Sequence, residues 1–208
     1  MHHHLLILST VLAVVWGQQE DCSTPPAGWP KRPPQCCDLP FPLEGMKKEF
    51  GSCIRKIGNR QSSTVPTAQA VRDARLCIEE CVYQGLGLMD KKDLQKDKLL
   101  EQLKQGVADN ADWSEPMEKA VVACHEEISK RESSAEGTCK DSAHEFTHCM
   151  MRRLFLSCPA SEWKASDECN LVKSRMEVCP NIPPPPPPPP QRFQGQGPPP
   201  PQFQQFPQ

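Results

Sequence analysis

The chain has 208 residues, with 12 Cys, 24 Pro and a formal net charge of −2. The near balance of 24 Lys and Arg against 26 Asp and Glu excludes the strong positive field on which nucleic-acid binding usually rests. Twelve cysteines favour a disulfide framework formed in an oxidising compartment, provided that the chain enters one. The length fits one modest folded core with appendages.

Residues 1–17 have the outline of a secretory signal peptide. An apolar stretch, residues 5–15, follows three histidines and precedes polar residues that begin at Gln18. This stretch is shorter than the roughly 20 residues that span a bilayer, and no other segment comes close. We therefore expect cleavage after about Gly17, secretion, and a mature protein with no membrane span. The alternative interpretation is a buried N-terminal helix.

Residues 18–182 are expected to form the folded domain, because residues 22–179 contain every cysteine. Its first part, residues 22–45, is rich in proline and holds the adjacent Cys36 and Cys37. Neighbouring cysteines rarely bond to one another, so each is expected to reach a separate partner. The two bridges would pin an irregular N-terminal arm across the domain.

From Met46 onward the apolar residues follow a helical period, and no alternating strand pattern occurs. Caps, glycines and prolines divide this region into about six helices. The expected segments are residues 46–57, a stretch from Pro66 towards Gly85 and Gly87, one capped by Asp90 and ending before Gly106, one capped by Ser114 and reaching Ile128, one from about Lys140 to before Pro159, and residues 166–178. The predicted fold is an all-α, compact, disulfide-crosslinked bundle.

The fifth expected helix is apolar around most of its circumference, which is typical of a helix buried on all sides. Cys149 and Cys158 lie nine residues apart on it, so they point in opposite directions. Cys77 and Cys81 are four residues apart and share one face of the second helix. These spacings predict a central helix tied to different neighbours, and a second helix whose two cysteines reach separate partners.

Residues 183–208 are expected to be a disordered, Pro/Gln-rich tail. Eight consecutive prolines, Pro183 to Pro190, favour an extended polyproline II segment, and the remaining residues cannot bury enough apolar area to fold. The alternative is a ligand for an aromatic-lined groove of the kind that binds Pro-rich peptides.

The cysteine intervals resemble the six-cysteine signature of the insect odorant-binding protein family. That signature has three residues between its second and third cysteines and eight between its fifth and sixth. Cys77 with Cys81, and Cys149 with Cys158, match these two intervals. The resemblance covers about residues 22–179 and does not extend to the tail.

The additional cysteines, and Pro159 directly after Cys158, look like the Plus-C (twelve-cysteine) subgroup of that family. In this mapping Cys139 is an insertion between the fourth and fifth signature cysteines, and Cys169 follows the sixth. The resemblance implies three pairings: Cys53 with Cys81, Cys77 with Cys149, and Cys124 with Cys158. Three more bridges of unassigned pairing are expected among Cys22, Cys36, Cys37, Cys139, Cys169 and Cys179.

The resemblance also implies a function. It indicates a soluble extracellular carrier that binds small hydrophobic ligands, odorants or pheromone-like volatiles, in an internal cavity and delivers them to chemosensory receptors. It further implies a location in chemosensory lymph, no cofactor, and other odorant-binding proteins or a receptor as candidate partners. A crosslinked helical shell tolerates a cavity that would destabilise an uncrosslinked core.

Apolar residues on the inner faces of the expected helices are the candidates for the cavity lining. For any one of them, packing in a filled core is the alternative role, because pattern does not separate the two. The candidates are Phe50, Ile54, Leu76, Tyr83, Leu88, Met89, Leu100, Leu103, Met117, Val121, Phe146, Met150, Leu154 and Phe155.

A competing motif, HExxH, spans residues 144–148. In zinc hydrolases of this type the two histidines, here His144 and His148, bind the metal and the glutamate, here Glu145, acts as general base. Glu168 could be proposed as a third ligand, but the Gly and third His of the longer metzincin motif are absent. We therefore predict no catalytic and no metal site. A zinc hydrolase, and a secreted disulfide-rich interaction or structural protein without a cavity, remain the alternatives.

Three histidines, His125, His144 and His148, are the mature-chain side chains expected to titrate near neutrality. A pH switch at these positions is a hypothesis, and the alternative is that they are solvated surface residues. Arg152 and Arg153 are expected at the wetter edge of the central helix.

Overall fold

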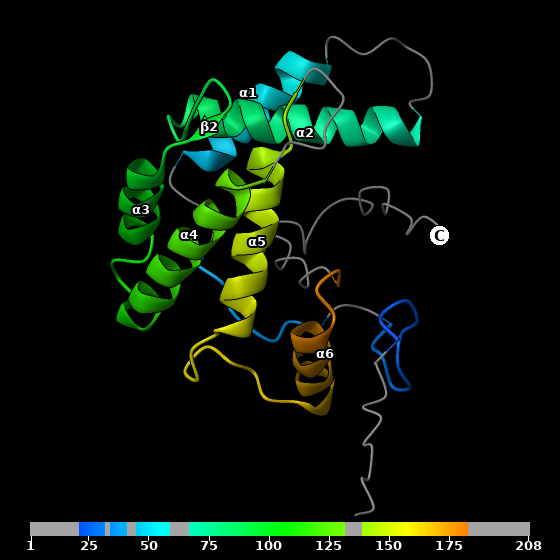
Figure 1. The fold of residues 1–208 in the computed structure, drawn as a ribbon. Coiled ribbons are helices and arrows are strands. Elements are labelled where there is room, and N and C mark those ends of the chain that lie inside the picture. Colours follow the sequence, from blue (N-terminus) through cyan, green and yellow to red (C-terminus); the bar gives the residue numbers. More distant parts are fainter. Residues whose placement is uncertain (1–20, 32–33, 41–44, 59–66, 132–138, 183–208) are drawn as a thin grey trace, which may run out of the picture.

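The structure is a computed structural model that describes residues 21–31, 34–40, 45–58, 67–131 and 139–182 (Figure 1). The predicted signal peptide and the predicted Pro-rich tail lie outside these ranges, so both stay predictions.

Helices dominate the described part of the chain, which confirms the all-α prediction. A two-stranded hairpin and one turn of 3-10 helix accompany them. In chain order the elements are α1 (Met46–Gly58), α2 (Ala68–Gly85), β1 (Met89–Asp90), β2 (Asp93–Leu94), α3 (Lys96–Gln105), η1 (Ala111–Trp113), α4 (Ser114–Ser129), α5 (Ser142–Leu156) and α6 (Asp167–Val178).

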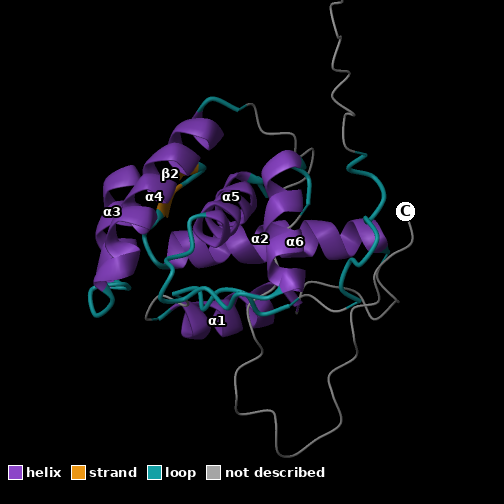
Figure 2. Ribbon diagram, turned by 90° about the horizontal axis from the view of Figure 1, so that it is seen from below, coloured by secondary structure: helices purple, strands orange, loops and turns teal. Residues whose placement is uncertain are grey.

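Helix α5 is the centre of the bundle, as its all-round apolar character predicts. It packs against α2, α4 and α6, and Phe146, Leu154 and Phe155 on it are buried. Figure 1 shows α2 crossing the N-terminal end of α5 and α6 lying near its C-terminal end. Figure 2 shows α3 and α4 on one side of α5 and α6 on the other. This arrangement places both faces of α5 in the core.

Side-chain caps explain where two helices begin. The Thr67 side chain accepts a hydrogen bond from the Ala70 amide at 3.2 Å, and α2 starts immediately after it. Ser166 caps α6 in the same way, accepting from the Cys169 amide at 3.1 Å. These hydroxyls satisfy backbone N–H groups that the first turn of a helix leaves without partners. The predicted start of α2 at Pro66 lies outside the described residues.

The prediction that Asp90 caps the third helix is wrong. Asp90 belongs to β1 and pairs with Asp93 across a two-residue turn in which Lys91 has a φ of 54°. The Gln84 side-chain amide donates to the Lys91 carbonyl at 2.8 Å. A strand of two residues is too short to show an alternating pattern, so the sequence gives no sign of the hairpin.

The fourth helix begins one residue away from the prediction. Ser114 is the first residue of α4 and not its cap, because the 3-10 turn η1 leads directly into the helix through Trp113. The Trp113 side chain is fully buried, which fixes this turn against the core.

The N-terminal arm lies across the C-terminal part of the domain, as predicted. Cys37 forms an antiparallel bridge with Trp163, and the Lys164 amide donates to the Cys36 carbonyl at 2.7 Å. The buried Arg175 of α6 donates to the carbonyls of Asp21 and Thr24. Backbone pairing and one buried guanidinium therefore hold the arm, whose described residues, 21–31 and 34–40, form no helix or strand of their own.

All twelve cysteines are described, and none of them is free. Cys36 and Cys37 reach separate partners, as do Cys77 and Cys81, and Cys149 and Cys158, which confirms the three expectations drawn from spacing. The bridges are Cys22–Cys179, Cys36–Cys169, Cys37–Cys158, Cys53–Cys81, Cys77–Cys139 and Cys124–Cys149.

Only one of the three pairings implied by the resemblance is confirmed, the Cys53–Cys81 bridge. The implied pairing of Cys77 with Cys149 is wrong, because Cys77 bonds to Cys139. The segment that holds Cys139 is fixed beside α2, since the Lys140 amide donates to a Glu80 carboxylate oxygen at 2.7 Å. This contact brings Cys139 to Cys77, with the two Cα atoms 5.1 Å apart.

The implied pairing of Cys124 with Cys158 is also wrong. Cys124 bonds to Cys149, because α4 packs directly against the face of α5 that carries Cys149. Cys158 follows the end of α5 and bonds to Cys37 of the arm. The central helix is thus tied to α4 on one side and to the arm beyond its C-terminal end.

Arg152 departs from the prediction for the edge of α5. Its guanidinium donates to the carbonyls of Met176, Cys179 and Ile182 at the C-terminal end of α6. It therefore ties α6 to α5 and does not sit at a wet edge. Arg153 is exposed as expected, and it pairs with Glu127 at 3.2 Å.

Among the described residues, none of the helices combines the length and the apolar character that crossing a membrane requires.

Candidate ligand-binding cavity

A partly enclosed apolar cavity of about 140 Å³ lies between α1, α2, α3 and α5. Four of the six described helices, and the turn after α2, contribute to its wall. The lining residues are Met46, Phe50, Glu79, Val82, Tyr83, Leu88, Leu99, Leu103, Phe146, Thr147 and Met150.

Helical spacing explains why these side chains converge. Phe146 and Met150 are one turn apart on α5, and Leu99 and Leu103 are one turn apart on α3, so each pair projects from one face of its helix. The same helix faces that would fill an ordinary core therefore enclose the cavity.

The cavity is closed on the inner side and opens towards α1. Leu88, Leu99 and Phe146 of the inner wall are at most 1% exposed. On α1, Met46 is half-buried and Phe50 is 45% exposed. Phe50 and Met46 therefore form the rim, and an incoming molecule would pass α1.

Two hydroxyl groups lie where α2 meets α5. The oxygens of Tyr83 and Thr147 are 2.9 Å apart, and Thr147 donates its own proton to the Ala143 carbonyl at 2.9 Å. Tyr83 therefore donates to Thr147. Burial raises the pKa of Tyr83, so its hydroxyl keeps the proton. The Tyr83 ring also meets Phe146 edge to face, with centroids 6.1 Å apart.

Glu79, one turn before Tyr83 on α2, is another polar residue that lines the cavity. One oxygen accepts from His144 Nδ1 at 2.9 Å and the other from Arg75 Nε at 3.1 Å. Burial opposes ionisation of Glu79, but its hydrogen bonds and electrostatic interactions with His144 and Arg75 outweigh burial and hold its pKa below the ordinary value. Glu79 is consequently ionised at neutral pH.

Six of the fourteen candidate residues line this cavity: Phe50, Tyr83, Leu88, Leu103, Phe146 and Met150. Met89, Met117, Val121, Leu154 and Phe155 instead pack in the core, Leu76 and Leu100 are half-buried away from it, and Ile54 is 44% exposed. Five lining residues were missed: Met46, Glu79, Val82, Leu99 and Thr147. Leu99 could have been found, because it lies one turn from Leu103, but nothing in the sequence marks Glu79 or Thr147 as cavity residues.

The HExxH residues are engaged in contacts of another kind. The rings of His144 and His148 have centroids 4.3 Å apart, His144 is bonded to Glu79, and Glu145 pairs with Arg131 at 2.7 Å. Glu168 lies in the first turn of α6. Within the described ranges, no group of three or more His, Cys, Asp or Glu side chains is arranged to hold a metal ion.

Replacing His148 by glutamine is expected to reduce the stability lost between pH 7 and pH 5. Burial lowers the pKa of His148 below 6.5, and the charges of His144 and Arg75 act in the same direction, against Glu79 and Glu145. The unfolded chain therefore binds this proton first as the pH falls, and folding is weakened. Urea midpoints at the two pH values measure the effect. An equal loss in wild type and variant would contradict it.

The carboxylate of Glu79 affects stability in a different pH range. Because its folded pKa lies below 4.5, the stability that it contributes is complete above that value and is lost as the pH falls below it. The comparison between pH 7 and pH 5 therefore reports on His148 and not on Glu79. His125, the third candidate histidine, places Nε2 3.2 Å from the Leu94 carbonyl, away from this cluster.

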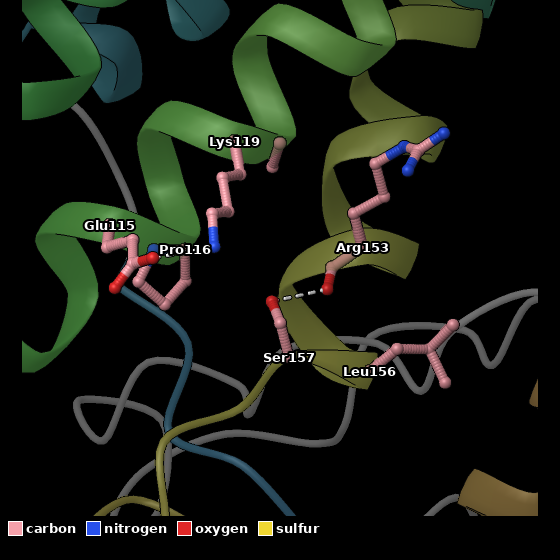
Figure 3. Close-up of a pocket in the computed structure, with 7 residues that line it drawn as sticks. Glu115, Pro116, Lys119, Arg153, Leu156 and Ser157 are labelled. Carbon is pink, nitrogen blue, oxygen red and sulfur yellow. Dashed lines mark hydrogen bonds and ion pairs between the residues drawn. The ribbon is translucent and has the colours of Figure 1, made fainter.

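A second pocket, of about 480 Å³, lies on the surface between α4 and the C-terminal end of α5 (Figure 3). Its rim is charged and exposed: Lys119 pairs with Glu115 at 2.6 Å, and Arg153 also lines it. The remaining lining residues are Pro116, Ala120, Leu156 and Ser157. Its polar, exposed rim makes it a weaker candidate for a hydrophobic ligand than the cavity behind α1.

Comparison of the sequence with known proteins identifies the family of this chain. The sequence profile described as the PBP/GOBP family matches residues 43–153, more than half of the chain. The chain belongs to the PBP/GOBP family. The match spans α1 to α5 and so includes every element that lines the cavity.

Two curated proteins from Anopheles gambiae are similar to this chain. General odorant-binding protein 68 is 24% identical over 188 residues, which cover 85% of this chain and 84% of the relative. Odorant-binding protein 47 is 25% identical over 164 residues, covering 73% and 70% respectively. The twelve cysteines fit the Plus-C subgroup of insect odorant-binding proteins. The PBP/GOBP family is a family of binding proteins, and nothing in the comparisons points to catalysis.

The extent of the PBP/GOBP match explains the two wrong disulfide pairings. Six cysteines lie within residues 43–153, and Cys158 does not. These six pair first with third, second with fifth and fourth with sixth, which is the order that the resemblance implied. Cys139 and Cys149 are thus the fifth and sixth signature cysteines. Cys158, at the end of the eight-residue interval after Cys149, bonds to Cys37 and takes no part in this pairing pattern.

Proposed function

We propose that the protein is a secreted carrier that holds one small hydrophobic molecule in the cavity behind α1 and delivers it to a chemosensory receptor. The observation that carries the proposal is a partly enclosed apolar cavity in a member of the PBP/GOBP family. The relatives' names, which describe odorant-binding proteins, support the same ligand class. Six disulfides fit the oxidising environment outside the cell.

The size of the cavity sets the size of the ligand. A cavity of about 150 Å³ lined by Leu, Ile and Phe binds benzene and stays dry when empty. The cavity behind α1 is about 140 Å³, and most of its lining residues are likewise apolar. The cavity therefore fits a molecule with one ring or an equally small chain. Its transfer from water into the cavity would be favourable by roughly 25 cal/mol per Å² of apolar surface buried.

Crosslinks around the cavity support its persistence without a ligand. The Cys53–Cys81 bridge joins α1 to α2, and the Cys77–Cys139 bridge joins α2 to the residues before α5. Helices that are tied together collapse less readily into a void, and the bridges destabilise the unfolded chain. The cost of the cavity is offset in this way.

Toluene is expected to bind with one molecule per chain, and Val82→Phe is expected to weaken binding at least about tenfold. Val82 is buried and lines the cavity, so the larger side chain occupies ligand space. Val71→Phe is the matched control on the same helix, because Val71 is exposed and lies away from the cavity. Isothermal titration calorimetry measures both, with circular dichroism as the check on folding.

No saturable toluene binding by the wild-type protein would defeat the carrier proposal. That result would favour a secreted disulfide-rich interaction or structural protein. Equal binding by the wild type and Val82→Phe would place the site elsewhere in the molecule.

A further inference from the structure

Three of the residues that line the cavity carry polar side-chain groups. Glu79, Tyr83 and Thr147 supply them, and the other lining side chains are apolar. Glu79 and Tyr83 are one turn apart on α2, and Tyr83 is bonded to Thr147 of α5. A ligand in the cavity therefore meets its polar partners where α2 crosses α5.

Neither the Tyr83 nor the Thr147 hydroxyl has a proton left to donate to a ligand. Thr147 donates its only hydroxyl proton to the Ala143 carbonyl, and Tyr83 donates its own to Thr147. Each oxygen still carries lone pairs. Both groups can therefore accept a hydrogen bond from a ligand, but neither can donate one without breaking a bond inside the protein.

Glu79 likewise accepts hydrogen bonds and does not donate them. An ionised carboxylate only accepts, and its two oxygens offer about four acceptor positions. His144 occupies one position and Arg75 a second, so positions remain for a ligand. The Glu79 side chain is 14% exposed, which limits the competition from water.

We infer that the cavity selects single-ring or equally small molecules that donate a hydrogen bond, such as alcohols, phenols and N–H heterocycles, and that Glu79 is the residue that determines this selection. A ligand hydroxyl can donate to the carboxylate or to the hydroxyl oxygens. The oxygen of an aldehyde, ketone or ester would face lone pairs only, and a ligand carboxylate would also meet the Glu79 charge. This inference rests on the proposed carrier function.

The test compares two ligands of nearly the same shape. Benzyl alcohol and benzaldehyde each have one ring and one oxygen, but only the alcohol donates. Because hydrogen bonds to charged groups are the strong ones, benzyl alcohol is expected to bind at least about tenfold more tightly than benzaldehyde to the wild-type protein. Isothermal titration calorimetry at pH 7 measures both affinities, with toluene as the ligand without a polar group.

Glu79→Gln supplies the reciprocal test. Glutamine keeps the size of the side chain but adds an N–H₂ donor, so the ratio of alcohol to aldehyde affinity is expected to fall about tenfold. Glu126→Gln is the matched control: Glu126 also pairs with a cation four residues away, Lys130, but it is exposed and outside the cavity. If Glu79→Gln fails to fold, Tyr83→Phe removes one acceptor and is expected to lower the same ratio.

The outcomes separate this inference from the proposed function. Equal affinities of the wild type for the two ligands, or a preference for benzaldehyde, would overturn the selection while the carrier function stands. An alcohol preference that Glu79→Gln leaves unchanged would show that Glu79 does not determine it. Saturable binding of none of the three ligands would overturn the carrier function, and the selection with it.

Discussion

Phe146→Ala is expected to lower the free energy of unfolding by about 3–5 kcal/mol. The variant is also expected to bind larger ligands than the wild-type cavity accepts. Phe146 is fully buried, packs edge to face on Tyr83, and forms part of the cavity wall. Truncation removes its packing contacts and joins the vacated volume to the existing cavity. Urea unfolding measures the loss of stability.

The ligand effect of Phe146→Ala is measured with 2-naphthol, which has two fused rings and one hydroxyl. The wild-type cavity of about 140 Å³ fits one ring, so the variant is expected to bind 2-naphthol at least about tenfold more tightly than the wild type does. Fluorescence titration gives both affinities.

Phe155→Ala is the matched control for this change. Phe155 lies on the same helix and is 2% exposed, but it packs on Trp163 and does not line the cavity. A similar loss of stability is expected without a gain in affinity for 2-naphthol. If Phe155→Ala gained as much as Phe146→Ala, a general loosening of the core and not the cavity would explain the binding.

Removing the Cys77–Cys139 bridge as a pair is expected to leave a folded protein without free thiols. Cys77→Ala with Cys139→Ala removes both sulfurs of one bridge, and the five other bridges keep their partners. The bridge closes a loop with a sequence separation of 62 residues, so its loss is expected to cost about 4 kcal/mol in the loop-entropy account. A decrease in Tm on the order of 10 °C should follow.

The contrasting variant combines Cys77→Ala with Cys149→Ala. It deprives both Cys139 and Cys124 of their partners, so thiol titration of the denatured, unreduced protein is expected to find two free thiols per chain. The first variant is expected to give none. The opposite result, with two thiols in the first variant and none in the second, would restore the pairing that the resemblance implied.

Residue patterns within short stretches of the sequence were sufficient to predict most of the helices. The all-round apolar residues of α5 predicted its central position, and glycines after α2 predicted its end near Gly85 and Gly87. The hairpin of β1 and β2 could not be predicted, because its two-residue strands form through a turn at Lys91 and contacts such as the one from Gln84. These contacts lie close together in the sequence, but strands of two residues show no alternating pattern that could reveal them.

The disulfides show more clearly which features the sequence could predict and which depended on the tertiary structure. Spacing alone predicted that Cys36 and Cys37 would separate, because adjacent cysteines rarely bond to each other. It could not decide between Cys139 and Cys149 as the partner of Cys77. That choice depends on the docking of the residues before α5 beside α2, where Glu80 accepts the Lys140 amide.

The sequence by itself determined the helical class, the family resemblance and a set of fourteen apolar candidates for the cavity wall, since each follows from period, spacing or residue type. Only the tertiary structure decided which apolar side chains face a void and which fill the core, because both obey the same helical period. Glu79 is the clearest case. Its place on a helix is evident from the sequence, but its role at the cavity depends on α5, which brings His144 into hydrogen-bond contact with it from 65 residues away.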